Sequence, residues 1–175
     1  MVGTRKAGAT AKVPVVRETV PYVERLLWSA GLVRVAGIDE VGMGPLAGPV
    51  VAAAVVFAAD AKPLRGIADS KRLPAPAREA AAVAIRKAAM GIGIGVVDPE
   101  EIDRLNIYRA GLEAMRRAVT ALPFAAEHLL VDARHIPDLD VPQTKYVRAD
   151  AIVYSVAAAS IVAKVHRDAL MQEVD

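Results

Sequence analysis

Residues 37–51 read GIDEVGMGPLAGPVV, and this stretch decides how the first two strands of the fold are connected. Leu32 to Ile38 has the composition of a strand, and Pro49 to Phe57 is a second strand, apolar on both faces. The glycine-rich segment between them is too short to hold a crossover helix. We therefore expect an antiparallel pair, with the two acids Asp39 and Glu40 placed directly after the first strand.

The rest of the chain alternates between helical and strand patterns. The residues of GIGIGVV (91–97) alternate between glycine and branched side chains, which indicates a strand with one bare face and a closely packed neighbour. The predicted order of elements is typical of an α/β fold, a mixed sheet with helices packed on it. We predict helices over 21–30, 76–90, 98–105, 107–122 and 151–171, and further strands over 91–97, 128–131 and 144–148.

Composition limits the chemistry that the chain can perform. The 175 residues include no cysteine and only three histidines, so a bound metal would be held by oxygen ligands. The absence of cysteine also fits a reducing cytoplasm. No apolar run reaches the roughly 18 residues of a membrane span. We expect a cytoplasmic monomer with a flexible basic tail over residues 1–17 and a single domain over residues 18–175.

Carboxylates follow three of the predicted strands. Asp39 and Glu40 come after the first, Asp132 after LLV and Asp150 after the short fifth strand. Acids gathered at one end of a sheet repel each other unless a cation lies between them, and carboxylate oxygens favour Mg²⁺ or Mn²⁺. Two such ions about 4 Å apart stabilise the attacking and leaving oxygens of a phosphodiester. Taken singly, however, Asp132 and Asp150 each favour a structural explanation, a turn former or a helix cap, and Asp150 would fit the N-cap of the helix that follows.

A dinucleotide site is the competing interpretation, because Gly42-Met43-Gly44-Pro45-Leu46-Ala47 fits the pattern G-x-G-x-x-A. That motif normally opens a helix, whose N-terminus binds pyrophosphate. Here the loop opens a strand, Pro45 removes one backbone donor, and two acids precede the loop. The isolated motif is weak evidence, and we set the dinucleotide interpretation aside.

Several separated blocks, in this order, resemble bacterial ribonuclease HII from about Val20 to the last residue. The blocks are GIDEVGMGPLAGPVVAAAVV, DSKRL, IDRLNIYRAGLEAMRRAV, LLVDAR and ADAIVYSVAAASIVAKVHRD. The resemblance implies an RNase H-like fold and an endoribonuclease that hydrolyses RNA in RNA/DNA hybrids, including single ribonucleotides within duplex DNA. It also implies a two-metal mechanism that leaves 5′-phosphate and 3′-hydroxyl ends.

The resemblance assigns roles to individual positions. It implies that the metal ligands are Asp39, Glu40, Asp132 and Asp150. The family's Gly-Arg-Gly, whose backbone meets the ribose 2′-hydroxyl, falls on residues 42–44, with methionine in place of arginine. For Ser160 and Asn106, tight helix packing and a helix break are comparable explanations. The positions that match substrate contacts are Gly42, Met43, Gly44, Pro45, Ser70, Lys71, Asn106, Ser160 and Lys164.

The end of the chain departs from the family. The resemblance implies a further tyrosine-bearing segment that stacks on the nucleotide and C-terminal helices that grip the duplex, and the sequence ends at Asp175 before both. We therefore consider a second function, a domain that binds RNA/DNA hybrids with weak or no catalysis.

Overall fold

The computed structural model describes residues 17–44 and 47–173, and within them five strands form one mixed sheet. Its spatial order is β3-β2-β1-β4-β5. The pairs β1–β2 and β2–β3 are antiparallel, whereas β1–β4 and β4–β5 are parallel, so the predicted antiparallel first pair is confirmed. The strands are β1 (Val35–Val41), β2 (Val50–Val56), β3 (Gly91–Val97), β4 (His128–Asp132) and β5 (Gln143–Tyr146).

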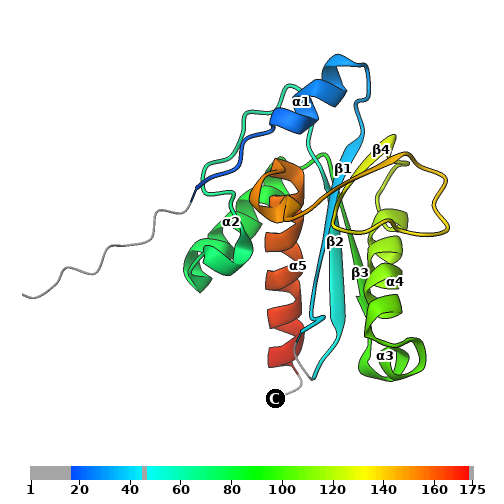
Figure 1. Ribbon diagram of the computed structural model, residues 1–175. Helices are drawn as coiled ribbons and strands as arrows, with labels where there is room; N and C mark the ends of the chain where they lie inside the picture. The colour runs from blue at the N-terminus through cyan, green and yellow to red at the C-terminus, as the bar shows by residue number, and fades with distance from the viewer. Residues whose placement is uncertain (1–16, 45–46, 174–175) are drawn as a thin grey trace, which may run out of the picture.

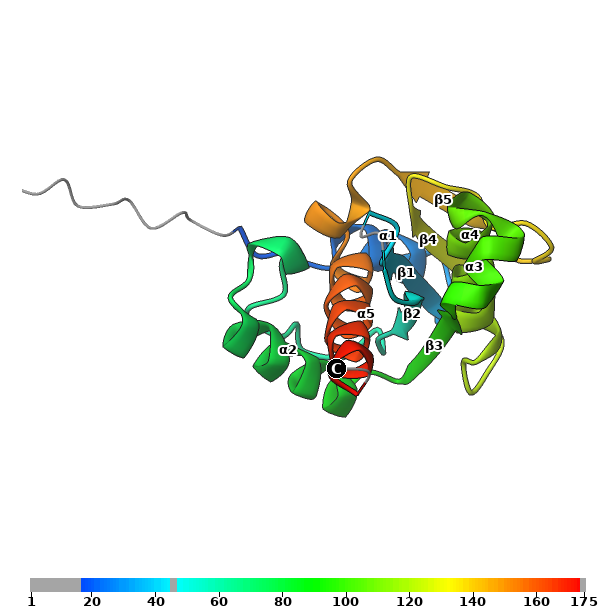
Figure 2. The ribbon, with the colours of Figure 1, turned by 90° about the horizontal axis from the view of Figure 1, so that it is seen from below.

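Helices cover both faces of this sheet, which makes a three-layer α/β fold (Figures 1 and 2). On one face α5 (Tyr154–Gln172) lies against β1 and β2, with α2 (Ala75–Ala88) beside it. On the other face α4 (Ile107–Thr120) crosses β3 and β2, preceded by α3 (Pro99–Leu105). The short helix α1 (Tyr22–Ser29) contacts the start of β1 and the first part of α5. Three apolar clusters result among the described residues: one beneath α4, one between β2 and the helices α2 and α5, and a smaller one where α1 and the start of α5 meet β1 and β4.

Glycines bring the helices unusually close to the sheet. A Cβ atom added at Gly93 or Gly95 would lie 2.0 Å from a carbonyl oxygen of α4, which confirms the close approach predicted for the bare face of β3. On the opposite face, a Cβ atom at Gly37 would lie 2.2 Å from the backbone carbon of Ser155 in α5. Only hydrogen side chains leave this space, so the glycines of β1 and β3 fix the distance between the layers.

The structure corrects three predicted boundaries. Strand β1 continues to Val41, because it stays paired with β2, and the acids at 39 and 40 therefore lie inside the strand rather than after it. Strand β5 ends at Tyr146 rather than 148, since Arg148 takes a left-handed backbone conformation (φ 59°). The last helix begins at Tyr154 rather than 151, and a separate 3₁₀ turn, η2 (Ala149–Ala151), precedes it.

The predicted basic tail lies almost wholly outside the described residues, since only Arg17 of it is included. Within the described part of the chain, none of the helices has the length and apolar character needed to cross a membrane.

Candidate functional site

Two of the predicted acids lie side by side because β1 and β4 are parallel neighbours. Ile38 pairs with Val131, so the next residue of each strand, Asp39 and Asp132, lies at the same level of the sheet. Asp39 is 5% exposed, and its Oδ1 accepts a hydrogen bond from the backbone N–H of Glu40 at 2.9 Å. The strand pairing therefore brings Asp39 and Asp132 together.

Asp132 also places the fourth acid. Its Oδ1 accepts a hydrogen bond from the backbone N–H of Ala149 at 2.7 Å, which fixes η2 against the end of β4. Asp150 is the next residue; it is buried, and Oδ2 lies 3.6 Å from the ammonium nitrogen of Lys71. The N-cap of α5 is Val153, so the structure excludes the explanation that Asp150 is merely the cap of that helix.

The acids influence each other's protonation. Burial raises the pKa of Asp39 well above its usual value, and the negative charges of Glu40, Asp132 and Asp150 raise it further. Burial is also the main cause that raises the pKa of Asp150, with a contribution from Asp69, while the charge of Lys71 opposes both. Three segments far apart in the sequence thus bring their carboxyl groups within electrostatic reach of one point.

Glu40 faces the opposite side of the sheet from Asp39, since successive strand residues alternate. Its neighbour Ile38 belongs to the core beneath α4, so Glu40 projects to the α4 side. Burial raises the pKa of its carboxyl group, and the charge of Arg134, 3.5 Å away, lowers it in part. Oε1 faces that arginine, whereas Oε2 is buried with no hydrogen-bond partner in the described part of the chain.

Within residues 17–44 and 47–173, no three acidic or histidine side chains are arranged as a ready set of metal ligands. The carboxyl groups instead turn toward the protein partners named above. The donor set nevertheless fits a hard divalent cation: it consists of carboxylate oxygens, one of them is buried without a partner, and mutual repulsion opposes their ionisation. A cation would relieve both costs, which favours a metal at this place.

The glycine loop is fixed to α5 by an arginine that sequence reasoning did not single out. Arg167 is 6% exposed, and its Nε and Nη2 atoms donate to the carbonyl oxygens of Pro49 and Ala47, each at 2.9 Å. Gly42 and Gly48 take left-handed φ values of 103° and 90° and pack against the same side chain. No local pattern in the sequence identifies this arginine, because its two partners lie 118 and 120 positions earlier in the chain.

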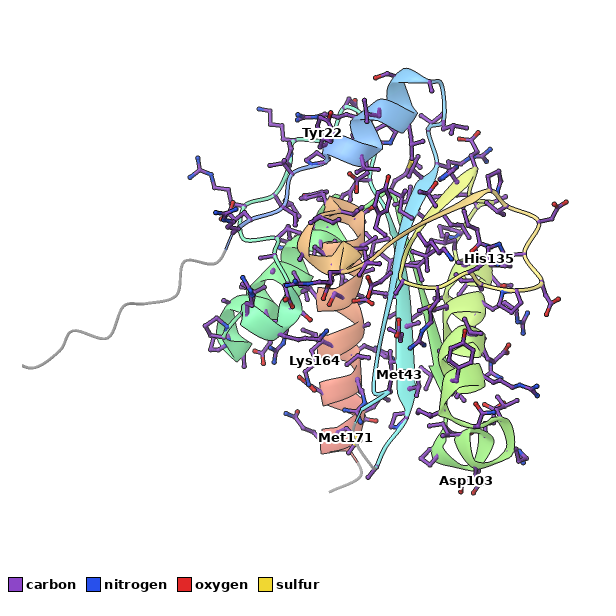
Figure 3. All side chains as sticks on the ribbon, in the orientation of Figure 1. Tyr22, Met43, Asp103, His135, Lys164 and Met171 are labelled. Carbon is purple, nitrogen blue, oxygen red and sulfur yellow. The ribbon has the colours of Figure 1, made fainter. Side chains whose placement is uncertain are left out.

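The predicted ribose-contacting residues of this loop differ in what the fold requires of them. Gly42 must be glycine, since a Cβ atom there would lie 2.6 Å from the Pro49 carbonyl oxygen. Gly44 is exposed, and nothing described lies within 4 Å of a Cβ atom built on it, so the fold itself does not need glycine there. Met43, labelled in Figure 3, packs against Gly111 of α4. Pro45 lies outside the described residues.

The Asp69-Ser70-Lys71 segment is held beside the acids by a pair of serines. The hydroxyl groups of Ser70 and Ser160 are 2.7 Å apart, and both side chains are buried. Asp69 caps the 3₁₀ turn η1 (Ser70–Arg72) by accepting from the Lys71 backbone N–H at 3.0 Å. Lys71 itself is 81% exposed at its side chain. The serines therefore position the lysine, which reaches both Asp150 and solvent.

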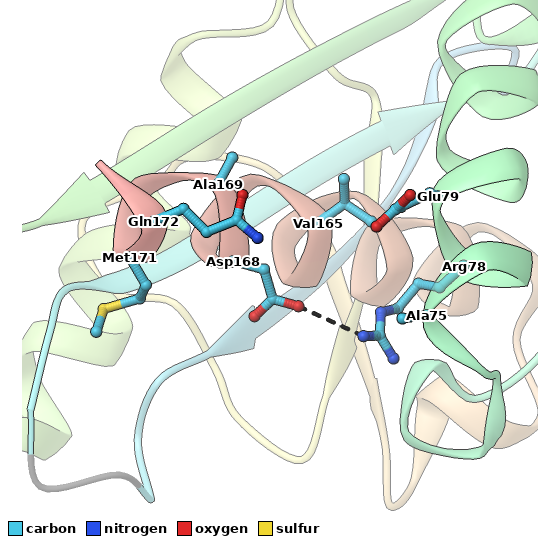
Figure 4. Close-up of a pocket in the computed structure, with 8 residues that line it drawn as sticks. All are labelled: Ala75, Arg78, Glu79, Val165, Asp168, Ala169, Met171 and Gln172. Atoms are coloured by element: carbon cyan, nitrogen blue, oxygen red, sulfur yellow. Dashed lines mark hydrogen bonds and ion pairs between the residues drawn. The ribbon is translucent and has the colours of Figure 1, made fainter. Parts of the chain in front are cut away.

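Two predicted substrate contacts, Lys164 and Asn106, interact with partners other than the four acids. Lys164 forms an ion pair with Asp168, which also pairs with Arg78 of α2 at 3.4 Å in a pocket between α2 and α5 (Figure 4). Asn106 caps α4, because its Oδ1 accepts from the Arg109 backbone N–H at 3.1 Å, and its own φ is 70°. The helix-break explanation therefore accounts for Asn106, and a substrate contact at either position stays a prediction.

The family model for ribonuclease HII matches residues 36–175, which include all four acids and the glycine loop. The chain belongs to the ribonuclease HII family. A ribonuclease HII of Geobacillus thermodenitrificans is 53% identical over 158 residues, or 90% of this chain, and one of Myxococcus xanthus is 52% identical over 153 residues, or 87%. The chain spans only 60% and 52% of these two relatives.

Solved structures agree with the ribonuclease HII assignment. Ribonuclease H2 from Pyrococcus horikoshii superposes with a TM-score of 0.69 at 27% identity, over 80% of this chain and 74% of that one. A ribonuclease HII from Archaeoglobus fulgidus, solved in complex with PCNA, gives 0.68 at 31% identity, over 81% and 76%. The predicted RNase H-like α/β fold is confirmed.

Proposed function

We propose that this chain carries the catalytic centre of an endoribonuclease that hydrolyses the RNA strand of RNA/DNA hybrids, including single ribonucleotides embedded in duplex DNA. The observation that carries the proposal is the convergence of Asp39, Glu40, Asp132 and Asp150, which come from β1, β4 and η2. Burial and the charge of Asp132 both raise the pKa values of the other three. Membership of the ribonuclease HII family supports the same reaction. Isolated turn or cap acids would not need to be buried together.

These four acids would hold two divalent ions, Mg²⁺ or Mn²⁺. When bound, such ions stabilise the charge on the attacking and leaving oxygens of a phosphodiester. The backbone contacts described above give two of the acids a fixed starting position: the Glu40 N–H holds Asp39, and the Ala149 N–H holds Asp132. Repositioning the carboxyl groups therefore requires side-chain rotation and no rearrangement of the sheet.

In the reaction, a water oxygen adds to phosphorus, the P–O3′ bond breaks, and the 3′ oxygen leaves as a hydroxyl group. The products are a 5′-phosphate and a 3′-hydroxyl. Lys71 would hold the backbone of the cleaved strand, and the exposure of its ammonium group next to Asp150 supports this role. Burial lowers its pKa, but Asp150, Asp39 and Asp69 together outweigh burial and raise the pKa above its usual value, so the group stays charged.

The glycine loop would supply selectivity for ribose. The 2′-hydroxyl group distinguishes RNA from DNA at a single position. Gly44 leaves open space where a side chain would otherwise project, and Arg167 holds the following segment of the loop through two carbonyl oxygens. A sugar can therefore lie directly against the loop backbone, which does not depend on the side chain at position 43.

The decisive experiment uses a duplex with one ribonucleotide in one strand, with cleavage followed on denaturing gels with and without Mg²⁺ or Mn²⁺. We expect wild-type cleavage, and we expect Asp39→Asn to abolish it. Asp60→Asn, at an exposed acid in a turn, is the matched control and should cleave normally. Undiminished cleavage by Asp39→Asn would sink the assignment. Anisotropy on the same duplex separates the second function, because binding without metal-dependent turnover would favour a hybrid-binding domain.

A further inference from the structure

Arg134 lies where the acids and the glycine loop meet on the α4 side of the sheet. It comes two residues after β4, beyond Ala133, whose left-handed φ of 54° turns the chain. Its Nη1 atom is 3.5 Å from Oε1 of Glu40 and 3.8 Å from Sδ of Met43, and the guanidinium carbon is 5.2 Å from the centre of the Tyr108 ring. One side chain therefore contacts a predicted metal ligand, the predicted ribose-contacting loop and α4.

The site around this guanidinium group is formed by α4. A Cβ atom at Gly111 would lie 3.0 Å from Nη1 of Arg134, so the glycine leaves the room that the arginine occupies. The ring of Tyr108 offers its face to the cation, and the side chain of Arg134 is only 24% exposed. Contacts on three sides fix its position, which is unlike the usual situation of a mobile surface arginine.

The residue at position 43 indicates what Arg134 contributes to this site. The sequence resemblance leads one to expect an arginine there, and the chain has methionine. The end of the Met43 side chain is 3.8 Å from the guanidinium group of Arg134, so a residue from a different segment brings a positive charge to the same place. We infer that Arg134 is a positioning residue of this site, which orients Glu40 and supplies the positive charge at the Met43 end of the glycine loop.

This inference rests on the proposed function, and it predicts opposite changes in two affinities, one for the duplex and one for the metal ion. A positive charge at this place attracts the phosphates of a nucleic acid and repels a divalent cation held by Glu40. Removing it should therefore weaken binding of the duplex and strengthen binding of the metal. A residue that merely stabilised the turn after β4 would change both affinities in the same direction, or neither.

The experiment compares wild type, Arg134→Ala, Met43→Arg and the double variant Arg134→Ala/Met43→Arg. Duplex affinity is measured by fluorescence anisotropy in EDTA, and Mn²⁺ affinity by electron paramagnetic resonance of the free ion. For Arg134→Ala we expect duplex binding about fivefold weaker and Mn²⁺ binding about fivefold tighter, as for one partly screened charge. Met43→Arg should restore both affinities in the double variant, whereas in the wild-type background it should weaken Mn²⁺ binding.

Met43→Leu, which adds no charge, is the matched control and should restore neither affinity when combined with Arg134→Ala. Should Arg134→Ala fail to fold, Arg134→Gln keeps most of the side-chain length without the charge and takes its place. Failure of Met43→Arg to restore the two affinities in the double variant, or parallel losses of both affinities in Arg134→Ala, would overturn the inference. A failure of the proposed function would give another result, because Asp39→Asn would then still cleave the ribonucleotide-containing duplex. The Mn²⁺ affinities of the four proteins would still report on Arg134.

Discussion

Glu24 offers the sharpest test of how the fold supports the site. The residue is 1% exposed, and its Oε1 atom accepts hydrogen bonds from the backbone N–H and the hydroxyl group of Ser155 at 2.7 and 2.6 Å. Ser155 lies in the first turn of α5 and also packs against Gly37, two residues before Asp39 in β1. Glu24 thus connects α1 to the place where α5 meets the acid-bearing strand.

The cost of Glu24→Ala follows from these contacts. Two hydrogen bonds contribute about 1 kcal/mol each, and Ser155 would be left with a buried donor without a partner, which costs about 1–3 kcal/mol more. The favourable interaction of a carboxylate with the N-terminus of α5 is lost as well. The substitution also removes Oε2, which is buried without a hydrogen-bond partner among the described residues, and this gain offsets part of the loss. We expect a net loss of about 3 kcal/mol, or a drop in melting temperature of about 6–12 °C.

Urea unfolding followed by circular dichroism measures this loss. Arg25→Ala is the control, because Arg25 is exposed on the same helix and should stay within about 0.5 kcal/mol of wild type. Ser155→Ala in the Glu24→Ala background should cost less than in wild type, by about 1 kcal/mol, since the two side chains share one hydrogen bond. A loss below 1 kcal/mol for Glu24→Ala, or strictly additive effects, would refute the reasoning.

Three further predictions concern the loop, the layer spacing and alkaline stability. Arg167→Met removes both hydrogen bonds to the glycine loop, so amide hydrogen exchange in residues 47–50 should accelerate about tenfold or more, while α2 keeps its protection. Unchanged exchange in residues 47–50 would show that Arg167 does not hold the loop. Gly95→Ala drives a methyl group into the backbone of α4 and should lower the free energy of unfolding in urea by about 3 kcal/mol. Gly44→Ala should leave this free energy within about 0.5 kcal/mol of wild type but slow cleavage at a ribonucleotide. Equal losses of stability in the two variants would contradict this prediction. Burial raises the pKa of Tyr154 above its unfolded value of about 10, so the unfolded chain ionises first and the folded protein loses stability as the pH rises above 10. The urea midpoint should therefore fall between about pH 9 and 11 in wild type, and it should fall less in Tyr154→Phe. An equal fall in the variant would argue against this role of Tyr154.

The sequence predicted most of the sheet because its signals are local. The apolar run of β2 and the glycine alternation of β3 identify strands without any tertiary information, and the short glycine segment between the first two strands allows only an antiparallel pair. The boundaries near the site were less accurate. Strand β1 continues through Asp39 and Glu40 because pairing with β2 outweighs the preference of acids for strand ends.

Some residues of the candidate site could likewise be predicted from the sequence, and others could not. The four acids and the Asp69-Ser70-Lys71 segment were identifiable from residue type and order. Arg134, Arg167 and Glu24 were not, since each acts on a partner at least 90 positions away in the sequence. The structure adds to Lys164 an ion pair with Asp168 that the sequence did not indicate, and the phosphate contact suggested by its helix position stays a prediction.

The sequence by itself predicted which residues would carry the proposed chemistry, from carboxylates next to apolar strands, a glycine loop and an RNase H-like order of elements. The tertiary structure decided how their charges are balanced. Parallel pairing of β1 with β4 sets Asp39 beside Asp132, alternation along β1 sends Glu40 to the α4 side, and there Arg134 meets it. The physical reason is that electrostatic interactions depend on distances in space, which sheet register and strand faces set and sequence separation does not.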